Sequence, residues 1–216
     1  MYKIENNGEV LLGMKKAYMM ENAGHGLADY ILSEMGTSLA GKNIVSFCGT
    51  GNNGGDALVA SRHLSGYYGM FVTVIILGDL NDIRTEEAKT NFNIVKRMKS
   101  ISLLYGANSL DSASKQIANA DIIIDGIFGT GIKGNIRNPH SQAIEIINAS
   151  RAYVVSVDIP SGLDPDSGAI HDKCVKANAT VTFHRIKRGL IGREGFTGKV
   201  YLERIGIPIE AEEGIL

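Results

Sequence analysis

The sequence predicts an α/β fold in which a mostly parallel sheet lies between two layers of helices. Apolar, strand-like runs alternate with helix-like segments from residue 43 onwards, which is the pattern of right-handed βαβ units. The runs are almost continuously apolar, as at 71–77, which is typical of strands covered on both faces. Glycine-containing loops follow three of these runs, at the edge where open sheets bind ligands.

Residues 1–40 are expected to form an N-terminal helical extension, and residues 41–216 the α/β core of one domain. In the extension, apolar residues recur at helical spacing over 11–35, and we expect an interruption near Gly24 and Gly26. The expected strands span 43–48, 70–77, 101–105, 121–127, 153–158, 180–183 and 199–202. The expected helices of the core lie near 55–68, 85–99, 109–120 and 139–150. In the usual strand order of such sheets the first and fourth strands are neighbours, which brings their loops together.

Charge and composition exclude several functional classes. The 22 basic residues nearly balance the 23 acidic ones, so nothing favours binding to nucleic acid or to an anionic membrane. No apolar run approaches the roughly 20 residues that a membrane-spanning helix needs, and the N-terminus lacks the pattern of a secretory signal. Cys48 and Cys174 are expected to be reduced, structural thiols. We therefore expect a cytoplasmic protein.

The first glycine loop has the spacing of a phosphate-binding turn. Gly49, Gly51 and Gly54 satisfy G-x-G-x-x-G between a strand and a helix, where glycine lets the backbone approach a pyrophosphate. An ordinary strand-to-helix turn is the alternative. Asp56 is placed either to contact a ligand or to cap the helix, whereas the amide oxygen of Asn53 is available to join other hard ligands at this edge.

The loops after the fourth and fifth strands carry further oxygen ligands. Asp125 lies at the end of the fourth strand, and Ser161 follows the fifth. Asn53, Asp125 and Ser161 form an all-oxygen set that suits a hard cation rather than a soft transition metal. The alternative for Asp125 is a carboxylate that nearby backbone N–H groups hold.

Asp158 precedes a turn that contains Pro160 and Gly162, so its carboxylate has two interpretations. It hydrogen-bonds the backbone of that turn, or it acts as an acid, a base or a hydroxyl-binding group at the mouth of the site. We favour the second because two ligand-bearing loops converge there. Lys187, in the basic run 184–188, is either solvated like its neighbours or turned towards the site as a cation.

Three motifs in register resemble those of NAD(P)H-hydrate epimerases, the family of the YjeF N-terminal domain. They are 51–56 (GNNGGD), 125–131 (DGIFGTG) and 157–164 (VDIPSGLD), with weaker matches at 20–24 and 179–183. Because they run in order over most of the chain, they are far more specific than one glycine loop. The resemblance implies a Rossmann-like three-layer αβα sandwich that epimerises the R and S forms of hydrated NADH or NADPH.

The resemblance also assigns residues. It implies a potassium ion held by Asn53, Asp125 and Ser161, and Asp158 is the first choice for the catalytic acid–base group. The substrate contacts that it implies are Asn52, Asn53, Gly54, Gly55, Asp56, Gly129, Thr130, Gly131, Ile132, Lys133, Gly134, Asn135 and Asp158. It further implies a homodimer, in which the N-terminal helix is a candidate interface.

The resemblance leaves the reaction partner and two other functions open. The chain ends soon after its last strand, so the ADP- or ATP-dependent dehydratase that acts on the same substrate is expected to be a separate protein. A nucleotide- or protein-binding module without catalysis and an NAD(P)-dependent oxidoreductase are the alternative functions. Asp79 and Arg84 are weak pointers to the preference between NADH and NADPH forms, which the sequence does not predict.

Overall fold

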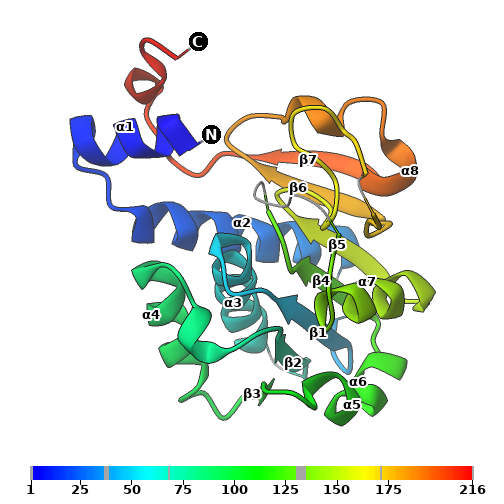
Figure 1. Cartoon of the computed structure of the whole chain (residues 1–216). Helices are drawn as coiled ribbons and strands as arrows, with labels where there is room; N and C mark the ends of the chain where they lie inside the picture. The colour runs from blue at the N-terminus through cyan, green and yellow to red at the C-terminus, as the bar shows by residue number, and fades with distance from the viewer. Residues whose placement is uncertain (1, 37–38, 68, 130–134, 171, 216) are drawn as a thin grey trace.

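Seven parallel strands form one sheet in the computed structural model, with the order β3-β2-β1-β4-β5-β6-β7 (Figure 1). The structure describes residues 2–36, 39–67, 69–129, 135–170 and 172–215. The strands are β1 (Asn43–Cys48), β2 (Phe71–Ile76), β3 (Ile101–Leu104), β4 (Ile122–Gly126), β5 (Tyr153–Val157), β6 (Ala179–Phe183) and β7 (Lys199–Glu203). All the expected strands are confirmed, and so is the expected pairing of the first with the fourth.

Helices cover both faces of the sheet (Figure 1). They are α1 (Tyr2–Leu12), α2 (Lys16–Met35), α3 (Asn52–Ser65), α4 (Glu86–Val95), α5 (Ser109–Ser112), α6 (Ser114–Ala118), α7 (His140–Ala149) and α8 (Glu194–Thr197). Three short 3₁₀ turns complete the described elements, η1 (Leu80–Asp82), η2 (Arg188–Leu190) and η3 (Ile209–Glu212). The three-layer sandwich that the sequence predicts is thereby confirmed.

Alternation along the strands divides the apolar core between the two faces. Ile122 and Ile124 of β4 pack with residues of α2, α3 and α4, whereas Ile123 packs with residues of α5 and α7. Successive side chains of a strand point to opposite faces, so a strand covered on both sides is apolar throughout. This explains the continuous apolar runs of the sequence.

The expected break in the N-terminal helix lies elsewhere. The interruption predicted near Gly24 and Gly26 is wrong, because α2 continues through both. The chain breaks after α1, where Gly13 has a φ of 69°, which favours glycine. Gly24 serves packing instead: a Cβ there would lie 2.3 Å from the Cβ of Val59, so its absence lets α2 approach α3 closely.

Two other helices differ from the prediction in extent. The helix expected at 85–99 ends at Val95, and the one expected at 109–120 is two short helices that meet at Ala113. The helix α1 begins well before the expected residue 11, and its centre consists of Asn6, Asn7 and Gly8, which are weak helix formers. Because α1 lies beside α2 and the C-terminal η3, its first turns reach the carboxyl edge of the sheet (Figure 1).

Candidate functional site

Asn53 joins the loops that follow β1, β4 and β5. It lies in the first turn of α3, and its Nδ2 donates hydrogen bonds to the carbonyl oxygens of Val157, at 2.7 Å, and Phe128, at 3.3 Å. A Cβ on Gly129 would lie 2.3 Å from the Oδ1 of Asn53, so only glycine leaves room for this side chain. The three glycine loops therefore meet at one edge, as strand order and loop position predict.

Asp125 is fully buried beneath this junction and is held by several donors. Its Oδ2 accepts hydrogen bonds from Ser156 Oγ at 2.8 Å and from the Ser161 backbone N–H at 2.9 Å, and its Oδ1 accepts one from Ser161 Oγ. The Ser161 hydroxyl also accepts a hydrogen bond from the backbone N–H of Phe128, at 2.9 Å. Burial raises the pKa of Asp125, and these hydrogen bonds act against that rise.

This arrangement fits a hard monovalent cation. Asn53 and Ser161 both hydrogen-bond the backbone of Phe128, and Asp125 contacts Ser161, so the three predicted ligands are brought together. No basic side chain of the described residues pairs with the buried Asp125, which leaves its negative charge for a cation to balance. Within the described ranges there is no group of three or more His, Cys, Asp or Glu that could hold a metal ion.

Asp158 and Lys187 form a buried ion pair at the same edge. Asp158 has a φ of 62°, a conformation that non-glycine residues rarely adopt. Its Oδ1 accepts hydrogen bonds from the Phe183 backbone N–H at 3.0 Å, from Thr182 Oγ1 at 3.2 Å, and from the ammonium of Lys187. Lys187 also donates to the Phe183 carbonyl oxygen at 3.0 Å, so it is the site-facing cation and not a solvated member of the basic run.

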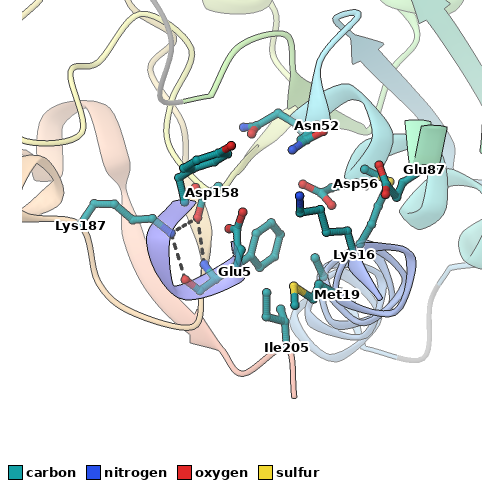
Figure 2. Close-up of a pocket in the computed structure, with 14 residues that line it drawn as sticks. Glu5, Lys16, Met19, Asn52, Asp56, Glu87, Asp158, Lys187 and Ile205 are labelled. Atoms are coloured by element: carbon teal, nitrogen blue, oxygen red, sulfur yellow. Dashed lines mark hydrogen bonds and ion pairs between the residues drawn. The ribbon is translucent and has the colours of Figure 1, made fainter. Parts of the chain in front are cut away.

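A cavity of about 160 Å³ opens in front of this ion pair (Figure 2). Asn52, Asn53, Asp56 and Asp158 line it, as does Lys187. The remaining wall comes from α1, α2 and the chain after β7, and includes Glu5, Lys16, Met19 and Ile205. Its mixture of carboxyl groups, ammonium groups and apolar side chains suits a small, partly polar ring.

Asp56 faces this cavity without a partner. It is 7% exposed, and its side chain makes no hydrogen bond or ion pair with another described residue. The alternative that it caps α3 is wrong, since Gly51 occupies the cap position and no side chain caps the helix. Burial raises the pKa of Asp56 well above its usual range, and the charges of Asp158 and Glu5 add to the rise.

A second, more open pocket of about 560 Å³ adjoins the first at Asn52 and Asn53. Gly129, Asn135 and Arg84 line it. Asn52 is held in position by Thr85, whose Oγ1 donates a hydrogen bond of 3.0 Å to its Oδ1. Both pockets are lined by Asn52 and Asn53 in the first turn of α3, where backbone N–H groups favour an anion.

Two of the predicted substrate contacts line neither pocket, and five lie outside the described residues. Gly54 and Gly55 line neither pocket: a Cβ on Gly54 would lie 1.9 Å from the Gly49 carbonyl oxygen, and one on Gly55 would lie 2.6 Å from Met20 Cε. Both glycines therefore allow close packing beneath the loop. Thr130, Gly131, Ile132, Lys133 and Gly134 lie outside the described residues.

Sequence reasoning missed the contribution of α1 and α2 to the cavity. Glu5 and Lys16 carry no motif, and only a prediction of α1 as a helix packed over the sheet edge would have pointed to them. Asp79 accepts a hydrogen bond from the backbone N–H of Asn81 at 2.8 Å, so its carboxylate caps a turn. Among the residues that the structure describes, no helix has the length and apolar character to cross a membrane.

Comparison with known proteins gives consistent matches. A family model described as YjeF-related protein N-terminus matches residues 16–189. The chain is 48% identical to an NAD(P)H-hydrate epimerase of Cenarchaeum symbiosum and 45% identical to one of Nitrosopumilus maritimus, in each case over 100% of this chain and 97% of the relative. It is 44% identical to a bifunctional NAD(P)H-hydrate repair enzyme of Pyrobaculum aerophilum, over 98% of this chain but 42% of that protein.

The fold comparison agrees with the sequence comparison. The crystal structure of a yeast protein superposes with a TM-score of 0.78 and 27% identity, over 93% of this chain and 84% of that one. A superposition of this quality over most of both chains supports the α/β architecture described above.

Proposed function

This chain belongs to the family of YjeF-related N-terminal domains, and from that premise we infer that it is an NAD(P)H-hydrate epimerase, an isomerase that acts in nicotinamide cofactor repair. The observation that carries the inference is its match, over almost their whole length, to two proteins of that name. The arrangement of Asp158 with the glycine loops supports it, because a titratable group lies beside a path suited to a dinucleotide.

The reaction inverts one carbon atom and needs proton transfer at the oxygen atom bound to it. In the hydrate a hydroxyl group sits on C6 of the nicotinamide ring, next to the ring nitrogen. The nitrogen lone pair can expel this hydroxyl as water once it is protonated, which leaves an iminium carbon that water can attack from either face. Addition to the face opposite the departing hydroxyl gives the other epimer, provided that a base removes the proton of the incoming water.

Asp158 is the proposed acid–base residue. Its carboxylate lines the cavity, and Lys187, Thr182 and the Phe183 N–H fix its orientation. In the Asp158→Asn variant we expect interconversion of the epimers to fall to the uncatalysed rate while ligand binding stays measurable. The exposed Asp166→Asn, in the loop that follows Asp158, is the matched control and should keep wild-type turnover. Near-normal turnover by Asp158→Asn would remove Asp158 from the acid–base role.

The substrate is proposed to span both pockets. The nicotinamide ring lies in the cavity beside Asp158, and the phosphates pass Asn52 and Asn53 at the N-terminus of α3 towards Gly129 and Asn135. This placement puts the anionic part of the substrate at the positive end of a helix dipole. Gly129 and Asn135 belong to the second pocket, which supports a contact with the distal part of the substrate.

A potassium ion is proposed at Asn53, Asp125 and Ser161. The all-oxygen donor set and the uncompensated charge of Asp125 support a monovalent cation there. When bound, the ion would supply charge compensation that fixes the loops after β1, β4 and β5 relative to one another. The residues themselves hold the loops through the hydrogen bonds of Asn53 and Ser161.

A homodimer is the proposed assembly. Tyr2, Val10 and Leu11 are exposed apolar residues of α1, with exposures of 75%, 68% and 63%, and they support an interface between two copies of the chain. Sedimentation at several protein concentrations would test this, and a mass of one chain throughout would contradict it.

We also propose a cytoplasmic location and a separate dehydratase. Cys48 and Cys174 are both buried free thiols, which is compatible with a reducing compartment. The Pyrobaculum aerophilum relative is named as bifunctional, and this chain covers only 42% of it. The dehydratase is proposed to use ADP or ATP and to act on the same hydrate, in keeping with the name of that relative, which describes two functions in NAD(P)H-hydrate repair. Neither nucleic acid nor a membrane is proposed as a partner, since the charges are balanced.

A further inference from the structure

The cavity contains a carboxyl group that no motif of the sequence identifies. We propose that Glu5 of α1 is a second catalytic residue of the epimerase, which exchanges a proton with the C6 oxygen in the step complementary to that of Asp158. The proposal rests on the epimerase function proposed above. Residues 1–15 precede the family match at 16–189, so the family comparison assigns no role to Glu5.

Packing of α1 brings Glu5 into the cavity. Ile4 and Gly8 form the buried side of α1, and a Cβ on Gly8 would lie 2.9 Å from Met19 Cε of α2. Glu5 follows Ile4 on this helix and lines the cavity together with Asp158 and Lys187. In Figure 2 its side chain points into the cavity, with Asp158 and Lys187 on one side and Asp56 on the other.

Glu5 is free to act on a ligand. It is half-buried, yet its carboxyl group makes no hydrogen bond or ion pair with any residue that the structure describes. Two neighbouring glutamates of the N-terminal helices are engaged: Glu9 pairs with Lys16 at 2.8 Å, and Glu21 pairs with Arg62. Because this carboxyl group faces the cavity and no described side chain holds it, it is available to a ligand that occupies the cavity.

The surroundings of Glu5 favour its protonated form. Burial raises the pKa of its carboxyl group, and the negative charge of Asp158 adds to the rise, while the charges of Lys187 and Lys16 oppose it. Asp158, in contrast, is bound by an ammonium group and two further donors. Two carboxyl groups in different surroundings therefore line the same cavity, which is a pattern that lets acid–base catalysis divide its roles between two groups.

Glu5 and Asp158 together account for every proton that the reaction moves. The Glu5 acid gives its proton to the C6 hydroxyl, the C6–O bond breaks, and water leaves as the ring nitrogen forms the iminium bond. Water then bonds to the other face of C6 and gives its proton to the Asp158 carboxylate, and solvent returns the proton from Asp158 to Glu5. Water leaves from one face of C6 and adds to the other, so each face needs its own proton-transfer group. In the reverse reaction Asp158 is the acid and Glu5 the base.

The test compares kcat and KM for epimer interconversion in Glu5→Gln and in Glu5→Met, which keeps the length of the side chain without its acid. We expect kcat to fall about 100-fold or more in both variants, with KM changed by less than about threefold and Tm close to that of the wild type. Glu5→Asp should restore part of kcat, because it restores an acid. Lys3→Gln, at an exposed position of the same helix that does not line the cavity, is the control and should keep wild-type kcat.

The outcomes separate this inference from the function on which it rests. A wild-type protein that does not interconvert the epimers defeats the proposed function itself. An active wild type with an unchanged kcat in either folded variant, or with a change confined to KM, overturns the role of Glu5 and leaves the function standing. A loss of kcat in both variants that Glu5→Asp partly reverses supports it.

Discussion

Asn53 donates a hydrogen bond of 2.7 Å from its Nδ2 to the carbonyl oxygen of Val157, and so ties the start of α3 to the end of β5. The two residues are 104 positions apart in the chain. Asp158 directly follows Val157. The bond therefore fixes the position of Asp158 relative to Asn53, which lines both pockets. The geometry of the site therefore depends on an amide group, which can donate to a carbonyl oxygen as well as offer an oxygen ligand.

Replacing Asn53 with aspartate should uncouple these loops. A carboxylate cannot donate to the carbonyl oxygens of Val157 and Phe128, so we expect Asn53→Asp to lower the free energy of unfolding by about 1–3 kcal/mol. Asn52→Asp is the control, because Asn52 is exposed and its Oδ1 accepts, rather than donates, its hydrogen bond from Thr85. Urea unfolding of both variants measures the difference, and equal stabilities would contradict the coupling.

Potassium should stabilise the fold selectively. At equal ionic strength we expect a higher Tm in KCl than in NaCl, because an ion held at Asn53, Asp125 and Ser161 binds only the folded state. Asp125→Asn should abolish this difference, since it removes the buried charge. Asp121→Asn, whose carboxylate is partly exposed and pairs with Lys42, should keep it. The same Tm in both salts for the wild type would argue against the site.

Asp56 should make stability depend on pH. Because its pKa is raised in the folded state, folded Asp56 retains a proton that the unfolded chain releases above about pH 4. The free energy of unfolding should therefore fall as the pH rises from about 4 through the folded pKa, by up to about 1.4 kcal/mol per pH unit for this one proton.

The Asp56→Asn variant isolates this dependence, because its side chain does not titrate. We expect it to gain stability relative to the wild type as the pH rises from 5 to 8, in urea unfolding at each pH. The exposed Asp166→Asn provides the control and should follow the wild-type curve. A constant difference between Asp56→Asn and the wild type across this range would show that Asp56 ionises normally in the folded protein.

The sequence predicts much of the fold and of the loop edge because both depend on local patterns. Continuous apolar runs identify the strands, and the usual strand order places Asn53, Asp125 and Ser161 together. The helix α1 is not predicted in full, since Asn6, Asn7 and Gly8 at its centre are weak helix formers. Glu5 therefore escapes sequence reasoning: its position depends on long-range packing of α1 against α2 and η3, which no motif encodes.

The structural roles of Gly24 and Gly54 could not be predicted from the sequence either. Glycine inside a helical pattern is expected to interrupt it, but a Cβ on Gly24 would meet Val59 of the neighbouring helix at 2.3 Å. Gly54 belongs to the phosphate-binding spacing, yet a Cβ there would meet the backbone of Gly49. In both cases the glycine is required by an approach between segments, and the sequence alone does not show which segment comes close.

The most direct measurement follows one pure epimer of the hydrate over time with the wild-type protein, in water enriched in oxygen-18. We predict that the other epimer forms faster than in a protein-free control, that the heavy isotope enters at C6, and that no hydride is transferred to a second substrate. Conversion of the starting epimer no faster than in the protein-free control would contradict the account, whatever the protein binds.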